Sequence, residues 1–130
     1  MKILLVTRLF PLPENVARGT FVSDHVELLS SLGHEVRVLN ILPRMLRINE
    51  ARRSTMEGVA KAPRSFQHGE FNVDVKRHFE FPDFPSITAF SASRCKTKWV
   101  PDLVICHTLW PAAYAAKSIA KKHSVPWVAV

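Results

Sequence analysis

Two hydrophobic periodicities follow each other along the first forty residues of the chain. An apolar run over 2–6 has the composition of a buried parallel strand. Apolar side chains then recur at helical spacing over 20–32, and Gly33 ends that segment. Residues 35–39 return to the composition of a strand. The pattern therefore predicts a strand, a loop over 8–19, a helix and a second strand.

The middle of the chain is less regular. Over 41–68 the apolar positions suit one short amphipathic helix, whose apolar face holds Leu42, Met45, Leu46 and Ile48. Apolar and polar residues alternate over 72–79, which predicts a half-exposed strand at a sheet edge. A modest second helix is predicted over 87–99, after a turn-rich connector with two prolines.

The last thirty residues return to a clear pattern. An apolar strand is predicted over 102–107, with Cys106 as a buried thiol, and another strand begins at 125. Between them Pro111 is well placed to begin a helix that continues to His123. Proline lacks an N–H, and an N–H at the first helical position would have no partner inside the helix. Strands that alternate with helices need crossover connections. The predicted fold is therefore α/β, a Rossmann-like, mostly parallel sheet flanked by helices.

Composition adds expectations about size and location. The sequence stops inside the last predicted strand, so we expect residues 1–130 to be the front part of a longer protein. No apolar run approaches the ~18 residues that a membrane span needs, and the first residues resemble a signal peptide only superficially. We therefore expect a cytoplasmic protein, with peripheral contact at the inner face of the membrane left open.

The two cysteines and six histidines lack metal-ligand spacing, so we expect no metal and no cofactor.

The charge balance bears on partners. Eighteen lysines and arginines against eleven acids give a formal net charge of +7, which favours phosphates on a nucleotide, a nucleic acid or an anionic membrane. No aromatic–basic motif accompanies the charge, so we expect no nucleic-acid partner. Part of the excess lies between Arg44 and Arg64, where an amphipathic helix on an anionic membrane and a solvated loop both fit.

The loop after the first predicted strand lies where a doubly wound sheet places its ligand. It lacks a G-x-G-x-x-G, which argues against a nucleotide-dependent oxidoreductase or epimerase. The amides of Gly19, Thr20 and Phe21 begin a helix and can point at an anion, although a plain turn at Gly19 fits as well. Thr20 is expected to be the N-cap of that helix. Arg8 and Arg18 either pair with a phosphate or lie solvated in the loop.

A second group of candidates surrounds the strand over 102–107. His107 ends this strand, at the edge where open α/β sheets place their sites. One interpretation is that His107 donates a hydrogen bond to a hydroxyl or phosphate of a substrate. The other is that it fixes the conformation of its own loop. Trp110 can pack a ring against a sugar near the same opening. His25, on the first predicted helix, is expected to be a surface or groove residue.

Three stretches together resemble the N-terminal domain of glycosyltransferase family 4-like enzymes, which are retaining enzymes with two facing Rossmann-like domains (the GT-B fold). The first is the opening strand with Arg18-Gly19-Thr20-Phe21. The second is the helix and strand around Leu32-Gly33-His34-Glu35-Val36. The third is Pro101-Asp102-Leu103-Val104-Ile105-Cys106-His107, followed by Trp110-Pro111.

The resemblance implies that residues 1–130 form the acceptor-side N-terminal domain of a hexosyltransferase-type enzyme. Such an enzyme moves a sugar with retention from a nucleotide-sugar donor to a sugar, a lipid-linked or a small-molecule acceptor. The resemblance puts Arg18, Gly19 and Thr20 near the donor phosphates, and His107 and Trp110 on the acceptor side. It assigns no catalytic residue here, because the acidic motif and most donor contacts belong to a C-terminal domain that this sequence lacks. We therefore expect the chain alone to be inactive.

A different class of protein stays open beside this interpretation. It is a non-catalytic, stand-alone α/β module that binds a ligand or regulates a partner. A response-regulator type would need acidic residues after the first strand, where Thr7, Arg8 and Leu9 stand instead.

Overall fold

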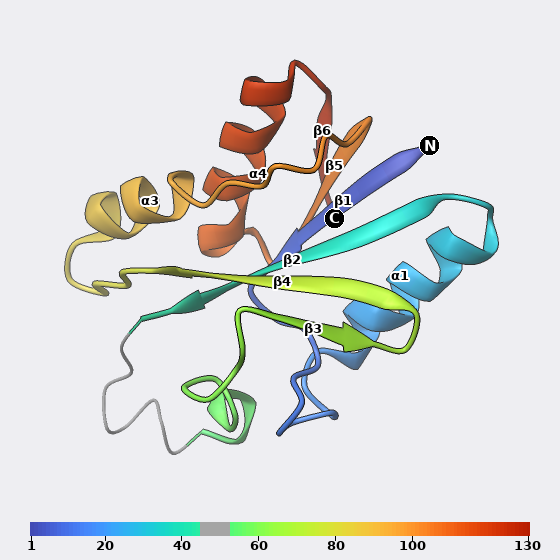
Figure 1. Cartoon of the computed structure of the whole chain (residues 1–130). Helices are drawn as coiled ribbons and strands as arrows, with labels where there is room; N and C mark the ends of the chain where they lie inside the picture. The colour runs from blue at the N-terminus through green and yellow to red at the C-terminus, as the bar shows by residue number, and fades with distance from the viewer. Residues whose placement is uncertain (45–52) are drawn as a thin grey trace.

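The strands form one six-stranded sheet. In the computed structural model, which describes residues 1–44 and 53–130, the strand order is β3-β4-β2-β1-β5-β6 (Figure 1). The strands are β1 (Lys2–Thr7), β2 (Glu35–Pro43), β3 (Ser65–His68), β4 (Phe71–His78), β5 (Leu103–His107) and β6 (Trp127–Ala129). All neighbours pair in parallel except β3 and β4, which form an antiparallel hairpin. The predicted mostly parallel α/β sheet is confirmed, and its order is compatible with a Rossmann-like fold.

Three α-helices in the described residues cover the two faces of the sheet (Figure 1). They are α1 (Thr20–Ser31), α3 (Pro85–Ser93) and α4 (Leu109–His123). The 3₁₀ turn η1 (Ser54–Met56) precedes β3. Val22 and Val26 of α1 pack on one face of β1 and β2, whereas Ala92 of α3 and Ile119 of α4 pack on the other face. Alternating residues of the central strands are thereby buried on both sides, which explains their continuous apolar runs.

The middle of the chain differs most from the prediction. β4 is not at the sheet edge, because β3 pairs with it in the register Phe66↔Val73. β2 continues to Pro43, so Leu42 lies in a strand rather than in the predicted helix. The other three residues of that predicted helix lie outside the described residues. The helix predicted over 87–99 ends at Ser93.

The C-terminal part follows the prediction closely. Cys106 is fully buried in β5, and burial raises the pKa of its thiol to about 11. Regular helical geometry in α4 begins at Pro111, because Trp110 has an extended backbone (φ −100°, ψ 128°). Lys121, Lys122 and His123 occupy the last turn, where positive charge stabilises the helix dipole.

Within the described residues, no helix is both long enough and apolar enough to cross a lipid bilayer.

Candidate functional site

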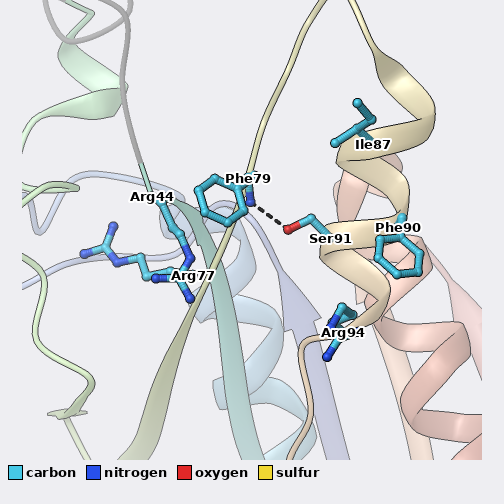
Figure 2. Close-up of a pocket in the computed structure, with 7 residues that line it drawn as sticks. All are labelled: Arg44, Arg77, Phe79, Ile87, Phe90, Ser91 and Arg94. Carbon is cyan, nitrogen blue, oxygen red and sulfur yellow. Dashed lines mark hydrogen bonds between the residues drawn. The ribbon is translucent and has the colours of Figure 1, made fainter.

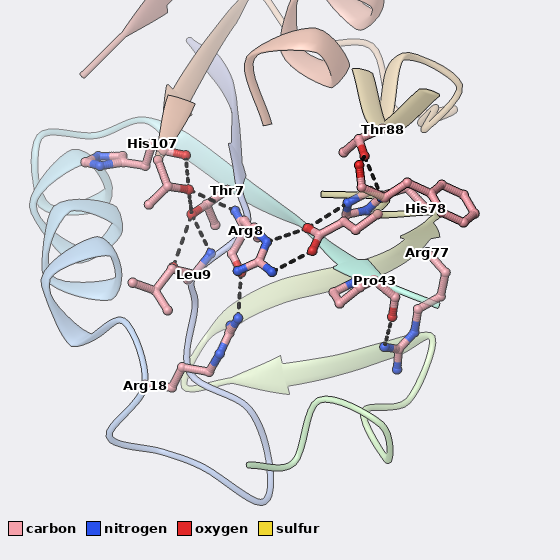
Figure 3. A network of polar contacts seen from close by, with 12 residues as sticks. Thr7, Arg8, Leu9, Arg18, Pro43, Arg77, His78, Thr88 and His107 are labelled. Atoms are coloured by element: carbon pink, nitrogen blue, oxygen red, sulfur yellow. Dashed lines mark hydrogen bonds and ion pairs between the residues drawn. The ribbon is translucent and has the colours of Figure 1, made fainter. Parts of the chain in front are cut away.

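The strand order reverses direction at β1, which has β2 on one side and β5 on the other. Loops that leave the carboxyl ends of β1 and β5 therefore turn to opposite faces of the sheet, and ligands of open α/β sheets bind at such a point. Here the two loops are joined by hydrogen bonds (Figure 3). The Thr7 and Thr108 hydroxyl oxygens lie 3.3 Å apart, and the backbone N–H of Arg8 donates to the Thr108 hydroxyl over 3.1 Å.

Gly19 sets how closely α1 approaches the loop after β1. Its φ of +62° lies in the left-handed region, which glycine adopts readily because it has no Cβ to clash with the backbone. A Cβ at this position would also lie 2.7 Å from the carbonyl oxygen of Leu9. The plain turn expected at Gly19 is therefore present, and it brings the first turn of α1 against the end of β1.

The predicted N-cap at Thr20 is wrong. Gly19 is the N-cap, it makes no side-chain capping hydrogen bond, and Thr20 is the first helical residue. The N–H groups of Gly19, Thr20 and Phe21 have no partner inside the helix, because the carbonyls four residues before them precede its start. The amides at Gly19, Thr20 and Phe21 thus form the positive end of α1, and this end favours an anion.

Arg18 is neither solvated nor directed at an open ligand position. Its side chain is 3% exposed and donates to three backbone carbonyls: Nε to Thr55 (2.6 Å), Nη1 to Phe10 (3.0 Å) and Nη2 to Arg8 (2.7 Å). Burial, and then the charge of Arg8, lower the pKa of Arg18 to about 10, so the side chain stays protonated at neutral pH. Arg18 therefore holds the loop in shape and adds positive charge behind the start of α1.

His107 meets His25 across the opening between β5 and α1. Nδ1 of His25 and Nε2 of His107 are 2.6 Å apart, and the two rings meet edge to face with centroids 4.8 Å apart. Only one proton fits between the two nitrogens, so the pair is stable when at least one ring is neutral. Burial, and then the proximity of His25, lower the pKa of His107. The second nitrogen of each ring has no hydrogen-bond partner in the described part of the chain and can meet a polar ligand.

A second polar network lies beside the first, at the carboxyl end of β4 (Figure 3). Arg8 and Glu80 form a bidentate ion pair with N–O distances of 2.6 and 2.8 Å, and Nε2 of His78 lies 3.0 Å from Glu80. Burial alone raises the pKa of Glu80, but the hydrogen bonds from His78 and Arg8 outweigh it and lower the pKa to about 2. Glu80 is therefore ionised at neutral pH and fixes the Arg8 side chain, which is only partly exposed.

The structure brings most, but not all, of the predicted site residues together. Phe21, in the first turn of α1, packs edge to face against His107 with ring centroids 6.3 Å apart. The start of α1 and His107 therefore belong to one site. Trp110 is half-exposed and packs against Tyr114 (5.7 Å between centroids). No ring contact joins Trp110 to His107 among the residues that the structure describes.

Two features of the site were missed in the sequence. The first is His25 as the partner of His107, and the second is the Arg8–Glu80–His78 network. Phe21 and His25 are four residues apart and share one helix face, so His25 could have been placed at the start of α1. Likewise, His78 lies near the end of the strand predicted over 72–79, and Glu80 follows that strand. The carboxyl ends of parallel strands meet at one edge of a sheet. These signals place the residues at the right ends of their elements, but they do not identify which residues become partners.

No group of three or more His, Cys, Asp or Glu side chains capable of holding a metal ion occurs in 1–44 or 53–130. The site presents backbone amides, the imidazoles of His25 and His107 and the charge of the buried Arg18. Comparison with protein-family models, with curated proteins and with solved structures finds no match to this chain.

Proposed function

We propose that the chain is the acceptor-side N-terminal domain of a retaining, family 4-like glycosyltransferase with a GT-B fold. The observation that carries this proposal is the meeting of the first turn of α1 with the His25–His107 pair, at the carboxyl edge where the strand order reverses. The resemblance in the sequence supplies the enzyme class, and the site supplies the chemistry that such a class needs.

The start of α1 is suited to a diphosphate. Its free amides and helix dipole favour negative charge, and the buried guanidinium of Arg18 adds a fixed positive charge behind them. Arg18 acts through this field rather than by contact, since it is buried and each of its three nitrogens donates to a backbone carbonyl. The ligand phosphates would lie against the amides of Gly19, Thr20 and Phe21.

The histidine pair is suited to a sugar hydroxyl on the acceptor side. A neutral imidazole donates through one nitrogen and accepts through the other, and the lowered pKa of His107 keeps it neutral at physiological pH. Because His25 and His107 bind each other, their remaining nitrogens are held in fixed positions. Because these groups are already ordered, they align an acceptor hydroxyl with no further loss of side-chain entropy. His107 and His25 are positioning residues in this proposal, and the acceptor-side role of Trp110 rests on the resemblance alone.

Equilibrium binding of nucleotides tests the donor side. The probes are UDP, GDP, UDP-glucose and GDP-mannose, with NADH as the probe for an oxidoreductase and inorganic pyrophosphate for phosphate chemistry alone. We expect weak binding of at least one nucleotide sugar, competition by pyrophosphate, and no binding of NADH. Preference for NADH would support the oxidoreductase class, and binding of none of these probes would overturn the proposed donor site.

Two substitutions at one position separate the amide from the side chain. Thr20→Pro removes the N–H of the first helical residue, where proline fits helix geometry, and is expected to weaken nucleotide binding several-fold. Thr20→Ala removes the hydroxyl and keeps the N–H, so it is the matched control and is expected to bind as the wild type does. Circular dichroism and thermal melting confirm that both variants fold. Equal losses in the two variants would contradict recognition by the amide.

A further inference from the structure

Five large apolar side chains are exposed together where β4 leads into α3. They are Phe79, Phe81, Phe84, Ile87 and Phe90, with exposed fractions between 36% and 63%. Phe79 and Phe81 stack with centroids 6.2 Å apart, and the Phe79 N–H donates to the Ser91 hydroxyl of α3 over 2.8 Å. Monomeric proteins rarely expose contiguous apolar side chains of this size without an interaction to serve.

Arginines lie beside three of these side chains, Phe79, Ile87 and Phe90 (Figure 2). The guanidinium of Arg44 lies 5.2 Å from the ring centre of Phe79, and that of Arg94 lies 5.8 Å from the ring centre of Phe90. Together with Arg77 they line a cavity of about 490 Å³ between β4 and α3. No ion pair joins these three arginines to a carboxylate in the described residues. We call the five apolar side chains and the three arginines the Phe–Arg patch.

The positive charge continues beyond the patch. An adjoining hollow of about 740 Å³ shares Arg44 and Arg77 with the cavity, and eight of its twelve lining residues are lysine or arginine. Asp74 is the one acid in that lining, and Trp99 is its one aromatic side chain. Among acids in the connector, Glu80 is held by Arg8 and His78, and Asp83 adds one further negative charge. The surface around the Phe–Arg patch is therefore strongly cationic.

We propose that the Phe–Arg patch docks the protein on the surface of an anionic lipid bilayer. Phenylalanine and isoleucine side chains enter the boundary between headgroups and acyl chains, whereas arginines reach the lipid phosphates from the level just above it. Lysines and arginines near an anionic leaflet each strengthen such binding. The surface lies outside the residues that the proposed donor site uses, so vesicle binding and nucleotide binding can succeed or fail separately.

Other occupants fit the patch less well. A small anion would use the arginines but leave Phe81 and Phe84, which lie outside the cavity lining, unexplained. A second copy of the chain would bring like charges face to face, because each copy presents three arginines at the patch. A single-stranded nucleic acid could stack on aromatic rings. However, it would have no use for the exposed aliphatic side chain of Ile87 or for rings spread along a helix start and its connector.

Flotation with lipid vesicles tests the proposal with the 130-residue chain. The probes are vesicles of phosphatidylcholine alone and vesicles in which about three lipids in ten are phosphatidylglycerol. We expect binding to the anionic vesicles, little binding to the neutral ones, and a loss as salt rises. Binding to neither vesicle, or equal binding to both, would overturn the proposal. So would protection of the patch by a short single-stranded RNA while vesicles fail to bind.

Paired variants locate the contact. Arg44→Gln with Arg94→Gln is expected to weaken binding about fivefold for each arginine. Phe84→Ser with Phe90→Ser is expected to weaken it about tenfold or more, because two apolar side chains lose burial. Arg77 is left unchanged, since it also donates to the carbonyls of Pro43, Val59 and Ala62.

The matched control substitutions lie outside the residues of the Phe–Arg patch, on two lysines and on two leucines near the end of α1. Lys2→Gln with Lys121→Gln removes the same charge at the start of β1 and the end of α4. Leu28→Ser with Leu32→Ser removes two exposed apolar side chains near the end of α1. Both controls are expected to bind anionic vesicles within about twofold of the wild type. Losses in the controls as large as those in the patch variants would show unspecific attraction and overturn the assignment of this surface.

Discussion

The charge of Glu80 depends on its neighbours, because Arg8 and His78 hold its carboxylate in a partly buried position. Glu80→Gln leaves Arg8 without its counter-ion, and we expect a loss of about 3 kcal/mol in the free energy of unfolding at neutral pH. Urea titration of wild type and variant measures this difference. Glu70→Gln, in the exposed turn between β3 and β4, is the control and should change stability by less than about 0.5 kcal/mol.

The contacts of Glu80 with Arg8 and His78 also predict that stability depends on pH. Folding lowers the pKa of Glu80 from its ordinary 4.5 to about 2, so its contribution is fully present above pH 4.5. It is lost as pH falls from 4.5 toward about 2, because the unfolded chain takes up the proton first. The stability difference between wild type and Glu80→Gln should therefore shrink at about pH 3. A difference that stays constant down to that pH would contradict the lowered pKa.

Two glycines with similar backbone angles allow the role of Gly19 to be isolated. Gly19 and Gly69 have φ of +62° and +59°, but of these two only Gly19 has atoms within 4 Å of the point that a Cβ would occupy. Gly69→Ala is expected to cost about 1–2 kcal/mol, from left-handed geometry alone. Gly19→Ala should cost about 3–4 kcal/mol, because the contact with Leu9 adds overpacking. Equal losses in chemical denaturation would mean that the approach of α1 to the β1 loop is not tight.

At the scale of elements, α1 is attached to β5 through the two histidines. The pKa of His107 is lowered in the folded protein, so its stabilising effect is full above its ordinary pKa and is lost as pH falls below that value. We expect the protection factors of the α1 amides, which are exchange rates corrected for intrinsic exchange, to fall as pH is lowered from about 7.5 to about 5.5. His25→Gln should remove this extra pH dependence, whereas His123→Gln, at the end of α4, should keep it. An unchanged pH profile in His25→Gln would contradict the role of the pair.

Elements with strong periodicity were predicted well, and short polar ones were not. The segment from β1 through β2 and the segment from β5 through α4 bury apolar side chains at regular spacing, so the pattern alone identifies them. β3 has four residues, of which only Phe66 is large and apolar, and it is defined by pairing with β4. Tertiary contact rather than local composition makes it a strand, and its absence from the prediction made β4 look like an edge.

The site was predictable in position but not in detail. The carboxyl edge of the sheet follows from strand order, which located Gly19 and His107 correctly at one edge. Burial of Arg18 depends on three carbonyls, one of which belongs to Thr55, far along the chain. The His25–His107 contact joins residues 82 positions apart. Such partners are fixed by the folded chain, and no local pattern in the sequence specifies them.

For the whole molecule, the proposed enzyme class predicts that the 130-residue chain transfers no sugar alone. Catalysis in such enzymes depends on positioning and charge stabilisation between two domains, and under our proposal this chain would supply only the acceptor-side wall. Radiolabelled UDP-glucose and GDP-mannose, incubated with the chain and a mixture of simple sugars and lipid extracts, measure transfer. Release of nucleoside diphosphate together with a labelled product would contradict the division of roles between the two domains.

The most direct test of the central claim is a nuclear magnetic resonance titration of the isotope-labelled chain with a nucleotide sugar. If the edge at β1 and β5 is the donor-facing site, the amides of Gly19, Thr20 and Phe21 should shift most. The ring signals of His25 and His107 should shift with them, while those of His123 stay in place. Largest shifts at the Phe–Arg patch, or no shifts with any nucleotide sugar, would contradict the account.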